Sequence, residues 1–397
     1  ISADSSLAAM SFKTTLDQFS GKLSFVKILG GVLKPDSEFV IDRDGKKFKG
    51  GKIYTALGKK LVDADELDAG DIGVIAKIGD AHTNDTFHAP NEFMHFRPLQ
   101  LPSPVYSLAI SAGSKKDEDK LNEQLVRTTE EDKTFTVTFD PETHETVIAG
   151  MGELHINTIL NRIKVSQKIE VETRPPRVAY RETITKSAET SYRHKKQSGG
   201  HGQFAEVHIR VRPLERGEEY DFVNEIKGGA VSKGFIPGIE KGFHEAMEHG
   251  VLAGYPVRDV GIALFDGKEH PVDSSEMAFK IAARGALRQA MQQCGPVLLE
   301  PVMKLAVFVE DQYLGDVLSD LSSKRGRVLG QDPLGGGIVE IDALVPQAEL
   351  LRYSIDLKSM TAGTGSFEMG FDHYDPVQGK IAEDIIANST YEEQEEH

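Results

Sequence analysis

The stretch "ETVIAGMGELHINTILNRIKVSQKIEVET", Glu145–Thr173, decides the fold because it holds a complete strand–helix–strand unit. Its first six residues have the β-branched and apolar composition of a strand, and "KIEVET" at its end predicts another. From Glu153 the apolar residues recur at helical spacing, with Leu154, Ile159 and Ile163 on one side. The spacing therefore predicts a helix that packs this side against the two strands.

The residues before this stretch complete a larger unit. "VYSLAIS" and "TFTVTFD" predict strands, and Lys116–Val126 between them has helical spacing through Leu121 and Leu125. The resulting order β-α-β-β-α-β is that of a split βαβ, ferredoxin-like layout. The proline-rich stretches "RPLQLPSP" and "RPPRV" mark its two borders.

The same order returns near the end of the chain. "VMKLAVFVE", "GRVLGQ", "GIVEIDALV" and "GSFEMGFDHY" predict strands. Tyr313–Lys324 and Ala348–Leu357 predict helices, and "DPLGGG" predicts the turn between the central strands. Two copies of one topology therefore bracket the middle of the chain.

The remaining segments have different patterns. Before "RPLQLPSP", short alternating runs cut by Gly and Pro predict a small antiparallel barrel. The middle opens with strands and then has two helices, one from Ile236 and one capped by Asp273. We therefore expect a multidomain α+β protein with a β-barrel segment (1–98), a first split segment (103–176), a middle segment (177–298), a last split segment (299–376) and an acidic C-terminal helix and tail (377–397).

Charge and composition limit the function. The chain of 397 residues has a formal net charge of -16, so any contact with nucleic acid has to be local rather than spread over the surface. Its one cysteine, Cys294, excludes an internal disulfide and fits a reducing cytosol. No apolar run is long enough to span a membrane. We therefore expect a cytoplasmic protein without a membrane partner.

Motifs for catalysis fail on spacing. No G-x-x-x-x-G-K-[ST] phosphate cradle occurs. In "HEAMEH", His244 and His249 are five positions apart, whereas zinc-binding histidines on one helix are four apart. His270, Asp273 and Ser274 lie too close in sequence to form a catalytic triad. The sequence therefore predicts no catalytic residue and no metal site.

Two basic or glycine-rich loops of the middle segment are candidates for RNA contact. Glycines let backbone N–H groups approach phosphates, and nearby cations attract them. The same composition also fits a flexible hairpin with solvated lysines, and composition alone favours that interpretation. The candidate residues are Arg193, Lys195, Lys196, Ser198, Gly199, Gly200, His201, Gly202 and Gln203 in the first loop, and Asp266, Gly267, Lys268 and His270 in the second.

Long blocks of the chain resemble, in order, the C-terminal four domains of elongation factor G, the ribosomal translocase. The resemblance covers nearly the whole chain, and the family's N-terminal GTP-binding domain has no counterpart in it. It therefore implies a fragment of a longer parent, with GTP and Mg²⁺ bound by the parent's GTPase domain. This chain alone is then expected to bind no cofactor and to hydrolyse no GTP. The blocks include "FKTTLDQFSGKLSFVKILGGVLKPDS", "GMGELHINTILNRIK", "PRVAYRETI", "QSGGHGQFAEVHI", "LFDGKEHPVDSSEMAFKIAA", "YLGDVLSDLSSKRGRVLG" and "FDHYDPV".

The resemblance also implies roles for the segments. The barrel corresponds to domain II, the split segments to domains III and V, and the middle segment to domain IV, a ribosomal protein S5 domain 2-like α+β domain. Domain IV would enter the decoding region of the small subunit, with both candidate loops at its tip beside tRNA and mRNA. Domain V would contact large-subunit RNA near the GTPase-activating region, with Lys324, Arg325 and Arg327 as candidates. The factor is expected to act as a monomer.

Departures from the family pattern leave other functions open. The family's "GGRGQYGHV" is "GGHGQFAEV" here, so His201 stands in place of a permanent cation and Glu206 adds an acid. In the last split segment, the family's Pro-Arg-Gly is Pro333-Leu334-Gly335. Each change removes positive charge. The alternatives are a paralogue that acts in ribosome recycling or in ribosomal protection against tetracycline, and an RNA- or protein-binding module without GTPase coupling.

Overall fold

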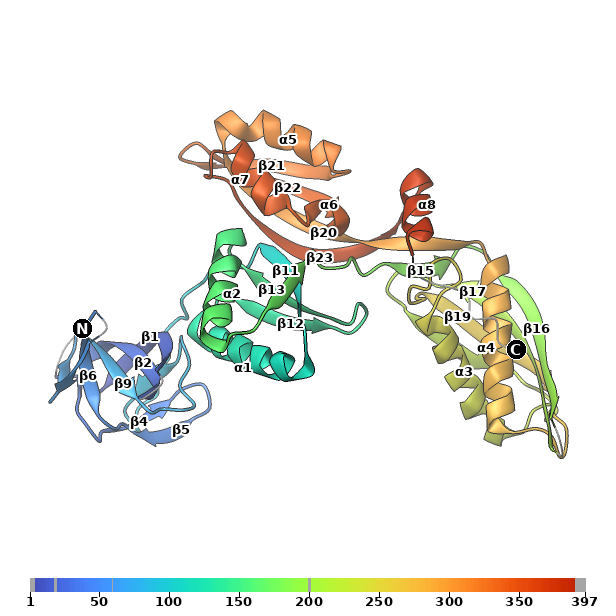
Figure 1. Ribbon diagram of the computed structural model, residues 1–397, viewed down its shortest axis with the longest axis horizontal. Helices are drawn as coiled ribbons and strands as arrows, with labels where there is room; N and C mark the ends of the chain where they lie inside the picture. Colours follow the sequence, from blue (N-terminus) through green and yellow to red (C-terminus); the bar gives the residue numbers. More distant parts are fainter. Residues whose placement is uncertain (1–3, 18–19, 59, 199–200, 390–397) are drawn as a thin grey trace. The chain divides into compact units, whose positions relative to one another are not determined.

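The computed structural model describes residues 4–17, 20–58, 60–198 and 201–389. The chain divides into two compact units, Ile1–Pro176 and Arg177–His397. Each unit contains both helices and sheets, so the predicted mixed α+β, multidomain class is confirmed (Figure 1).

The barrel segment forms an eight-stranded antiparallel sheet in the order β5-β4-β10-β1-β2-β9-β6-β7. The two ends of this order, β5 and β7, are not paired to each other within the described residues. The end strand β5 reads "KKFK", and lysines on an edge strand discourage pairing with another chain. The strands are β1 (Ala8–Asp17), β2 (Gly21–Gly30), β3 (Val32–Leu33), β4 (Glu38–Ile41), β5 (Lys46–Lys49), β6 (Ile53–Leu57), β7 (Lys60–Ala64), β8 (Leu67–Asp68), β9 (Ile72–Ala76) and β10 (Thr86–His88), with β3 and β8 as a separate pair.

The first split segment has a four-stranded antiparallel sheet in the order β12-β13-β11-β14. Its helix α2 buries Ile156, Ile159 and Ile163, whereas Leu154 is 80% exposed. The assignment of Leu154 to the core was wrong, because positions 156, 159 and 163 follow the i, i+3, i+7 spacing of one helix face and 154 lies off it. The elements are β11 (Tyr106–Ala112), α1 (Lys115–Glu131), β12 (Thr136–Asp140), β13 (Glu145–Gly150), α2 (Glu153–Gln167) and β14 (Val171–Arg174).

The last split segment repeats this order around its own sheet, with α5, α6 and α7 on one face (Figure 1). Two details differ from the prediction. The helix expected over 348–357 is two short helices. The turn predicted at "DPLGGG" is also shorter than expected, because only Gly336 and Gly337, both with positive φ, form a two-residue hairpin turn. Pro333 and Leu334 therefore belong to a strand. The elements are β20 (Pro296–Glu310), η2 (Asp311–Tyr313), α5 (Leu314–Ser323), β21 (Arg327–Gly335), β22 (Ile338–Pro346), α6 (Gln347–Leu350), α7 (Tyr353–Met360), β23 (Ser366–Pro376) and the C-terminal α8 (Gly379–Ala387).

The middle segment is a four-stranded sheet, β16-β17-β19-β18, with two helices on one face (Figure 1). Ala205, Val207 and Ile209 alternate along β17 and are buried with the apolar sides of these helices in one core. Helix α4 is alanine-rich on its buried side, which permits close packing. The elements are β15 (Arg181–Ile184), β16 (Ala188–Ser198), β17 (His201–Pro213), β18 (Tyr220–Asn224), η1 (Lys233–Phe235), α3 (Ile236–Glu248), β19 (Val260–Lys268) and α4 (Glu276–Gln293).

Strand β15 fixes the base of the middle segment to the last split segment. It pairs with β20 rather than with the sheet of its own segment. Within β15, the buried carboxylate of Glu182 accepts backbone N–H groups of Leu252, Ala253 and Tyr255, and burial raises the pKa of Glu182 above its usual range. Next to it, the guanidinium of Arg181 lies 4.2 Å from the ring centroid of Tyr374 in β23. These contacts join the base of the middle segment to the sheet of the last split segment.

Candidate nucleic-acid interface

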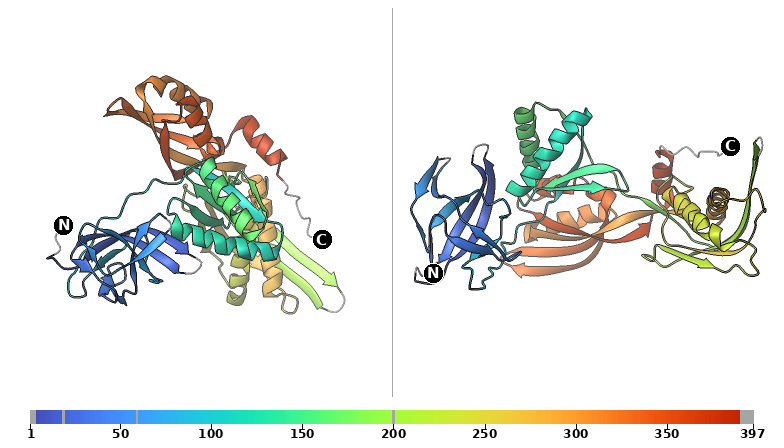
Figure 2. Two further views of the ribbon diagram at one scale, coloured as in Figure 1. Left: turned by 60° about the vertical axis from the view of Figure 1, so that its left-hand side comes forward. Right: turned by 90° about the horizontal axis from the view of Figure 1, so that it is seen from below.

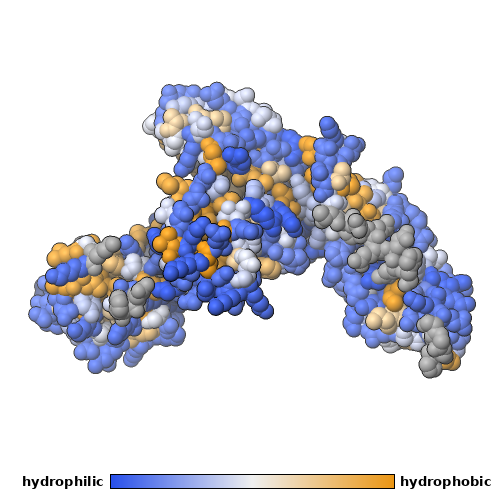
Figure 3. Space-filling model, viewed as in Figure 1, coloured by the Kyte–Doolittle hydropathy of each residue, from blue (hydrophilic) through white to orange (hydrophobic). Residues whose placement is uncertain are grey.

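The hairpin of β16 and β17 holds the first candidate stretch. The strands pair in register from Ala188–Val211 to Ser198–His201, and the hairpin stands out from the helices of its segment (Figure 2). Side chains alternate, so one face of the hairpin contributes to the core and the other is open to solvent. The middle segment is mostly hydrophilic on the side seen in Figure 3.

The basic residues lie on a strand and not in a loop. Arg193, Lys195 and Lys196 belong to β16, and Gly202 and Gln203 belong to β17. The predicted loop of 198–203 was therefore too long, because cross-strand pairing continues to Ser198 and His201, of which the structure describes the backbone only. Gly199 and Gly200 lie outside the described residues. The strand presents Lys195 and Lys196 as exposed side chains.

The second candidate stretch is also mainly strand. Asp266, Gly267 and Lys268 continue β19, since they pair with β17 from His208 to Glu206 beyond a bulge. The expected loop therefore begins only after Lys268 and contains His270. The helix after it is capped by Ser275, whose Oγ accepts the N–H of Ala278 at 3.1 Å. Ser275 directly precedes α4 and has the extended backbone of an N-cap, whereas Asp273 lies two residues earlier, so the predicted cap was wrong.

The two stretches meet at one end of the middle segment. The N–H of Phe204 donates to the carbonyl of Asp273 at 2.9 Å, and Ser274 Oγ donates to the carbonyl of Phe204 at 2.7 Å. The rings of Phe204 and His270 lie 6.2 Å apart, and Lys195 is the cross-strand partner of Phe204. We call the surface formed by Lys195, Lys196, Gln203, Phe204 and His270 the tip surface.

Gly202 gives a close approach where the two stretches meet. A Cβ on Gly202 would lie 3.0 Å from the carboxyl carbon of Asp273, tighter than most Cβ contacts, so the Asp273 side chain would have to shift. The backbone of β17 therefore comes close to the loop of His270, and the sequence position of this glycine has a steric reason.

His270 is held in one orientation. Its Nδ1 accepts the backbone N–H groups of Val272 at 3.3 Å and Asp273 at 3.2 Å. The same Nδ1 lies 3.2 Å from the carboxylate of Asp273, so the contacts within the loop engage Nδ1 and leave Nε2 as the ring nitrogen that faces away from them. The side chain is about half exposed, so this nitrogen is available to a ligand.

A third stretch, 227–235, reaches the same end of the segment and was missed in the sequence. Ser232 donates its N–H and its hydroxyl to the carboxylate of Glu269, both at 2.8 Å. Gly228 and Gly229 before it have φ of 71° and 73°, and Lys233 after it is exposed. The signal was present as Gly-Gly followed by Ser and Lys between a strand and a helix, a pattern typical of an exposed loop.

Glu206 changes the electrostatics near the tip surface. It is a buried carboxylate that accepts a hydrogen bond from Arg193 Nε at 2.5 Å and from His208 Nε2 at 3.0 Å. The Arg193 hydrogen bond is the main reason that the pKa of Glu206 lies below its usual range. Arg193 is therefore an ion-pair partner within the sheet. Lys195 has no hydrogen-bond or ion-pair partner among the described residues.

The basic stretch of the last split segment differs. Lys324 Nζ lies 2.8 Å from Asp320 and 3.3 Å from Asp356. Arg325 donates to both oxygens of the buried Glu300 and to Glu349. Hydrogen bonding to Glu300 is the main reason that the pKa of Arg325 is raised.

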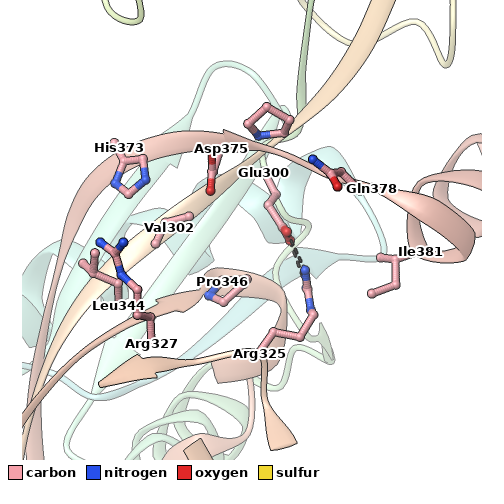
Figure 4. A pocket seen from close by; sticks show the side chains of 11 residues that line it. Glu300, Val302, Arg325, Arg327, Leu344, Pro346, His373, Asp375, Gln378 and Ile381 are labelled. Atoms are coloured by element: carbon pink, nitrogen blue, oxygen red, sulfur yellow. Dashed lines mark hydrogen bonds and ion pairs between the residues drawn. The ribbon is translucent and has the colours of Figure 1, made fainter. Parts of the chain in front are cut away.

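Within the described part of this stretch, Arg327 is the exposed cation without a hydrogen-bond or ion-pair partner. It lines a pocket of about 410 Å³ whose wall includes the Glu300–Arg325 pair, Val302 and Leu344 (Figure 4). Of the three residues predicted to contact large-subunit RNA, the structure thus leaves Arg327 open and pairs the other two.

The described residues offer no other chemistry that the sequence analysis considered. No three His, Cys, Asp or Glu side chains gather as metal ligands among them. In the same residues, no helix is both long and apolar enough to cross a membrane.

The turn from β13 to α2 does not fit a GTP phosphate cradle. The N–H of Met151 already donates to His155 Nδ1 at 3.1 Å. A Cβ on Gly150 would lie 2.9 Å from the same atom, so the His155 ring fills this turn. The turn also lacks the Lys and Ser or Thr of the phosphate-binding motif.

Four family models match consecutive parts of the chain. They are described as Elongation factor G domain 2 (residues 6–89), Elongation Factor G, domain III (101–175), Elongation factor G, domain IV (176–295) and Elongation factor G C-terminus (297–385). The four models follow one another in the order of the parent family. The chain belongs to the elongation factor G family.

Two relatives extend the match. An "Elongation factor G-like protein" of Thermotoga maritima is 41% identical over 395 residues, which cover 100% of this chain and 58% of that protein. A crystal structure from Thermus thermophilus has a TM-score of 0.82 at 35% identity, and covers 97% of this chain and 58% of that one. The chain thus spans a little over half the length of these relatives.

Proposed function

We propose that this chain is the part of a translational GTPase that promotes movement of tRNA and mRNA through the ribosome. In this proposal the tip surface enters the decoding region of the small subunit. The observation that supports it most is the convergence of three separate stretches, around Lys195, Ser232 and His270, on one end of the middle segment. Contacts between the three stretches hold a few polar side chains in place at this protruding end.

The groups of the tip surface suit RNA. Lys195 supplies a cation for a phosphate, His270 supplies a ring nitrogen for a hydrogen bond, and Phe204 supplies a ring for packing. The net charge of -16 opposes adhesion of the remaining surface to RNA. Binding then requires a site whose shape already fits the protruding end, which is how structured RNA is usually recognised.

Movement of the tip surface would depend on the rest of the parent protein. GTP and Mg²⁺ belong in this proposal to a GTPase domain outside this chain. The joint of β15 with β20 would transmit a displacement of the last split segment to the middle segment. Arg327 would contact large-subunit RNA, and the factor would act in the cytoplasm as a monomer.

The proposal is tested with the double variant Lys195→Ala/Lys196→Ala of the 397-residue chain. We expect weaker binding to bacterial small ribosomal subunits and a salt dependence shallower by about 0.7–0.9 in log–log slope for each phosphate that the variant no longer neutralises. Lys186→Ala is the matched control, since Lys186 is exposed in the same segment but precedes β16 at its far end. Equal behaviour of the double variant and the control would contradict a phosphate-facing tip.

A paralogue that acts in ribosome recycling or in tetracycline protection is the second candidate. The pairing of Arg193 with Glu206 favours it, because less positive charge faces the ligand than the basic sequence indicates. The Thermotoga relative is likewise described as elongation factor G-like. A translocation assay of the full-length parent separates the two, since a translocase moves tRNA and a specialised paralogue does not.

A further inference from the structure

Glu206 occupies a central position among the charges of the open sheet face. It lies on the middle strand β17, directly opposite Arg193 on β16 and opposite Lys268 on β19. Its side chain is 7% exposed, whereas Arg193 is 57% and Lys268 is 64% exposed. One buried carboxylate therefore faces two exposed cations, one on each side.

The contacts make this carboxylate a shared counter-charge. Arg193 Nε lies 2.5 Å from Oε2, and Lys268 Nζ lies 4.0 Å from Oε1. His208 Nε2 lies 3.0 Å from Oε1, and it is the donor because an ionised carboxylate only accepts. All the polar neighbours of Glu206 thus stabilise its charged form.

We propose that Glu206 is a specificity-determining residue that lowers the attraction of the tip for phosphate by cancelling one of the two positive charges of Arg193 and Lys268. This proposal rests on the proposed function, because it assumes that the tip surface contacts RNA. The cluster of Glu206, Arg193 and Lys268 has a net charge of +1 instead of +2. Lys195, two residues from Arg193 on the same face of β16, remains the unpaired cation among the described residues of the hairpin. Phosphate binding on this face of the hairpin then depends mainly on Lys195, and RNA that does not reach it is released.

The first test is Glu206→Gln in the 397-residue chain, with affinity for bacterial small ribosomal subunits measured between about 50 and 200 mM salt. Gln keeps the shape of Glu and can still accept the Arg193 hydrogen bond. A unit charge about 7 Å from a phosphate in water changes binding about threefold, so we expect an affinity about threefold higher at low salt. The salt slope should steepen by up to about 0.7–0.9.

Glu189→Gln is the matched control. Glu189 lies on β16 four residues before Arg193, and it is exposed and paired with Arg210. Glu189→Gln changes the net charge of the chain by the same amount as Glu206→Gln. Position 189, however, lies about 13 Å from position 193 along β16. We expect unchanged affinity and slope. An equal gain in both variants would show that overall charge is responsible, and would overturn the proposal.

A second variant keeps the buried carboxylate and guards against misfolding of Glu206→Gln. If the ion pair with Glu206 holds the Arg193 guanidinium away from a phosphate, then Arg193→Gln alone changes affinity by less than twofold, while Lys195→Gln, which removes a cation that can reach the phosphate, lowers it about threefold. In the Glu206→Gln background, Arg193→Gln should remove the gain. A loss from Arg193→Gln in the unmodified chain as large as that from Lys195→Gln would overturn the proposal.

The outcomes distinguish this inference from the proposed function. If Lys195→Gln and Glu206→Gln both leave affinity unchanged, the tip surface does not contact RNA and both proposals fail. If Lys195→Gln weakens binding but Glu206→Gln does not strengthen it, the tip contacts RNA and only the role of Glu206 is wrong.

Discussion

The two basic stretches of this chain, Arg193–Lys196 and Lys324–Arg327, have similar composition and different structures. In the first, the partner of Arg193 is one buried acid, and Lys195 extends into solvent without a described partner. In the second, Lys324 and Arg325 each form ion pairs with two acidic residues. A basic sequence therefore becomes a basic surface only where the fold leaves its cations unpaired.

Except for Asp320, which is four residues before Lys324, the acids that make this difference are distant in sequence. Glu300 and Glu349 approach Arg325 from β20 and α6, and Glu206 approaches Arg193 from the neighbouring strand. Since Arg325 is partly buried with a nearly inaccessible carboxylate, its ion pairs contribute to stability more than to ligand binding. In the first stretch, Arg193 is more than half exposed and Lys195 has no partner among the described residues, so these cations contribute less to stability.

The largest expected effect is that of Arg325→Ala on stability. Removing one partner of a buried ion pair leaves the other charge uncompensated, which costs about 3–5 kcal/mol. Because Arg325 itself is about one third exposed, we expect a loss near the lower end, about 3 kcal/mol. The measurement is the unfolding transition of the unit Arg177–His397 within the whole chain, by calorimetry and urea denaturation.

Arg327→Ala is the control for this variant, since Arg327 is exposed and lacks a partner among the described residues. It should change stability by less than about 0.5 kcal/mol. Similar losses from both variants would mean that the Glu300–Arg325–Glu349 contacts do not set the stability of this segment, and the comparison of the two stretches would lose its basis.

A smaller effect is expected from the acid response of Glu206. The native pKa of Glu206 lies below the usual glutamate range, chiefly because of the Arg193 hydrogen bond. The ionised carboxylate therefore stabilises the fold above the usual range, and this contribution is lost as pH falls from that range through the lowered pKa. Glu206→Gln should reduce stability at neutral pH by about 1 kcal/mol, because Arg193 is more than half exposed and solvent weakens the pair.

The measurement is urea denaturation at several values from about pH 7 to about pH 3. The variant should lose less stability than the unmodified chain across the acid range. Glu189→Gln, whose pair with Arg210 is exposed on both sides, should change stability by less than about 0.5 kcal/mol. Parallel pH curves for Glu206→Gln and the unmodified chain would contradict a stabilising ionised Glu206.

Much of the fold could be predicted from local patterns. The helices containing Leu121 or Ile239 follow a clear apolar period, and the strands around them alternate. The errors came where tertiary contacts override the local signal. Strand pairing extends β19 through Lys268, and Ser275 caps α4 instead of Asp273 because the helix begins only at Glu276.

The residue types of the candidate site could be predicted from the sequence, but which of its cations are paired could not. Glycines and lysines mark the hairpin around Lys195, and the resemblance to a family places His270 near it. The burial of Glu206 beneath Arg193 depends on strand register, which a single sequence does not give. The contact of Ser232 with Glu269 joins residues 37 positions apart, so the third stretch was invisible as part of the site.

The smallest expected effect is that of Arg327→Ala on ribosome binding. If the second stretch contacts large-subunit RNA at all, the unpaired Arg327 contributes more than Lys324, whose amine is already paired with Asp320 and Asp356. Removing one exposed cation from a phosphate should weaken binding to large ribosomal subunits about threefold at low salt and make the salt slope shallower by about 0.7–0.9.

Lys358→Ala is the matched control, because Lys358 is an exposed cation on α7 of the same segment. It should leave both quantities unchanged. Lys324→Ala sharpens the comparison, since it removes the same charge but from an ion pair, and its effect on affinity should be smaller than that of Arg327→Ala. The reverse order would show that pairing within the fold does not decide which cations reach RNA, and the same reasoning would then fail for Glu206 and Arg193.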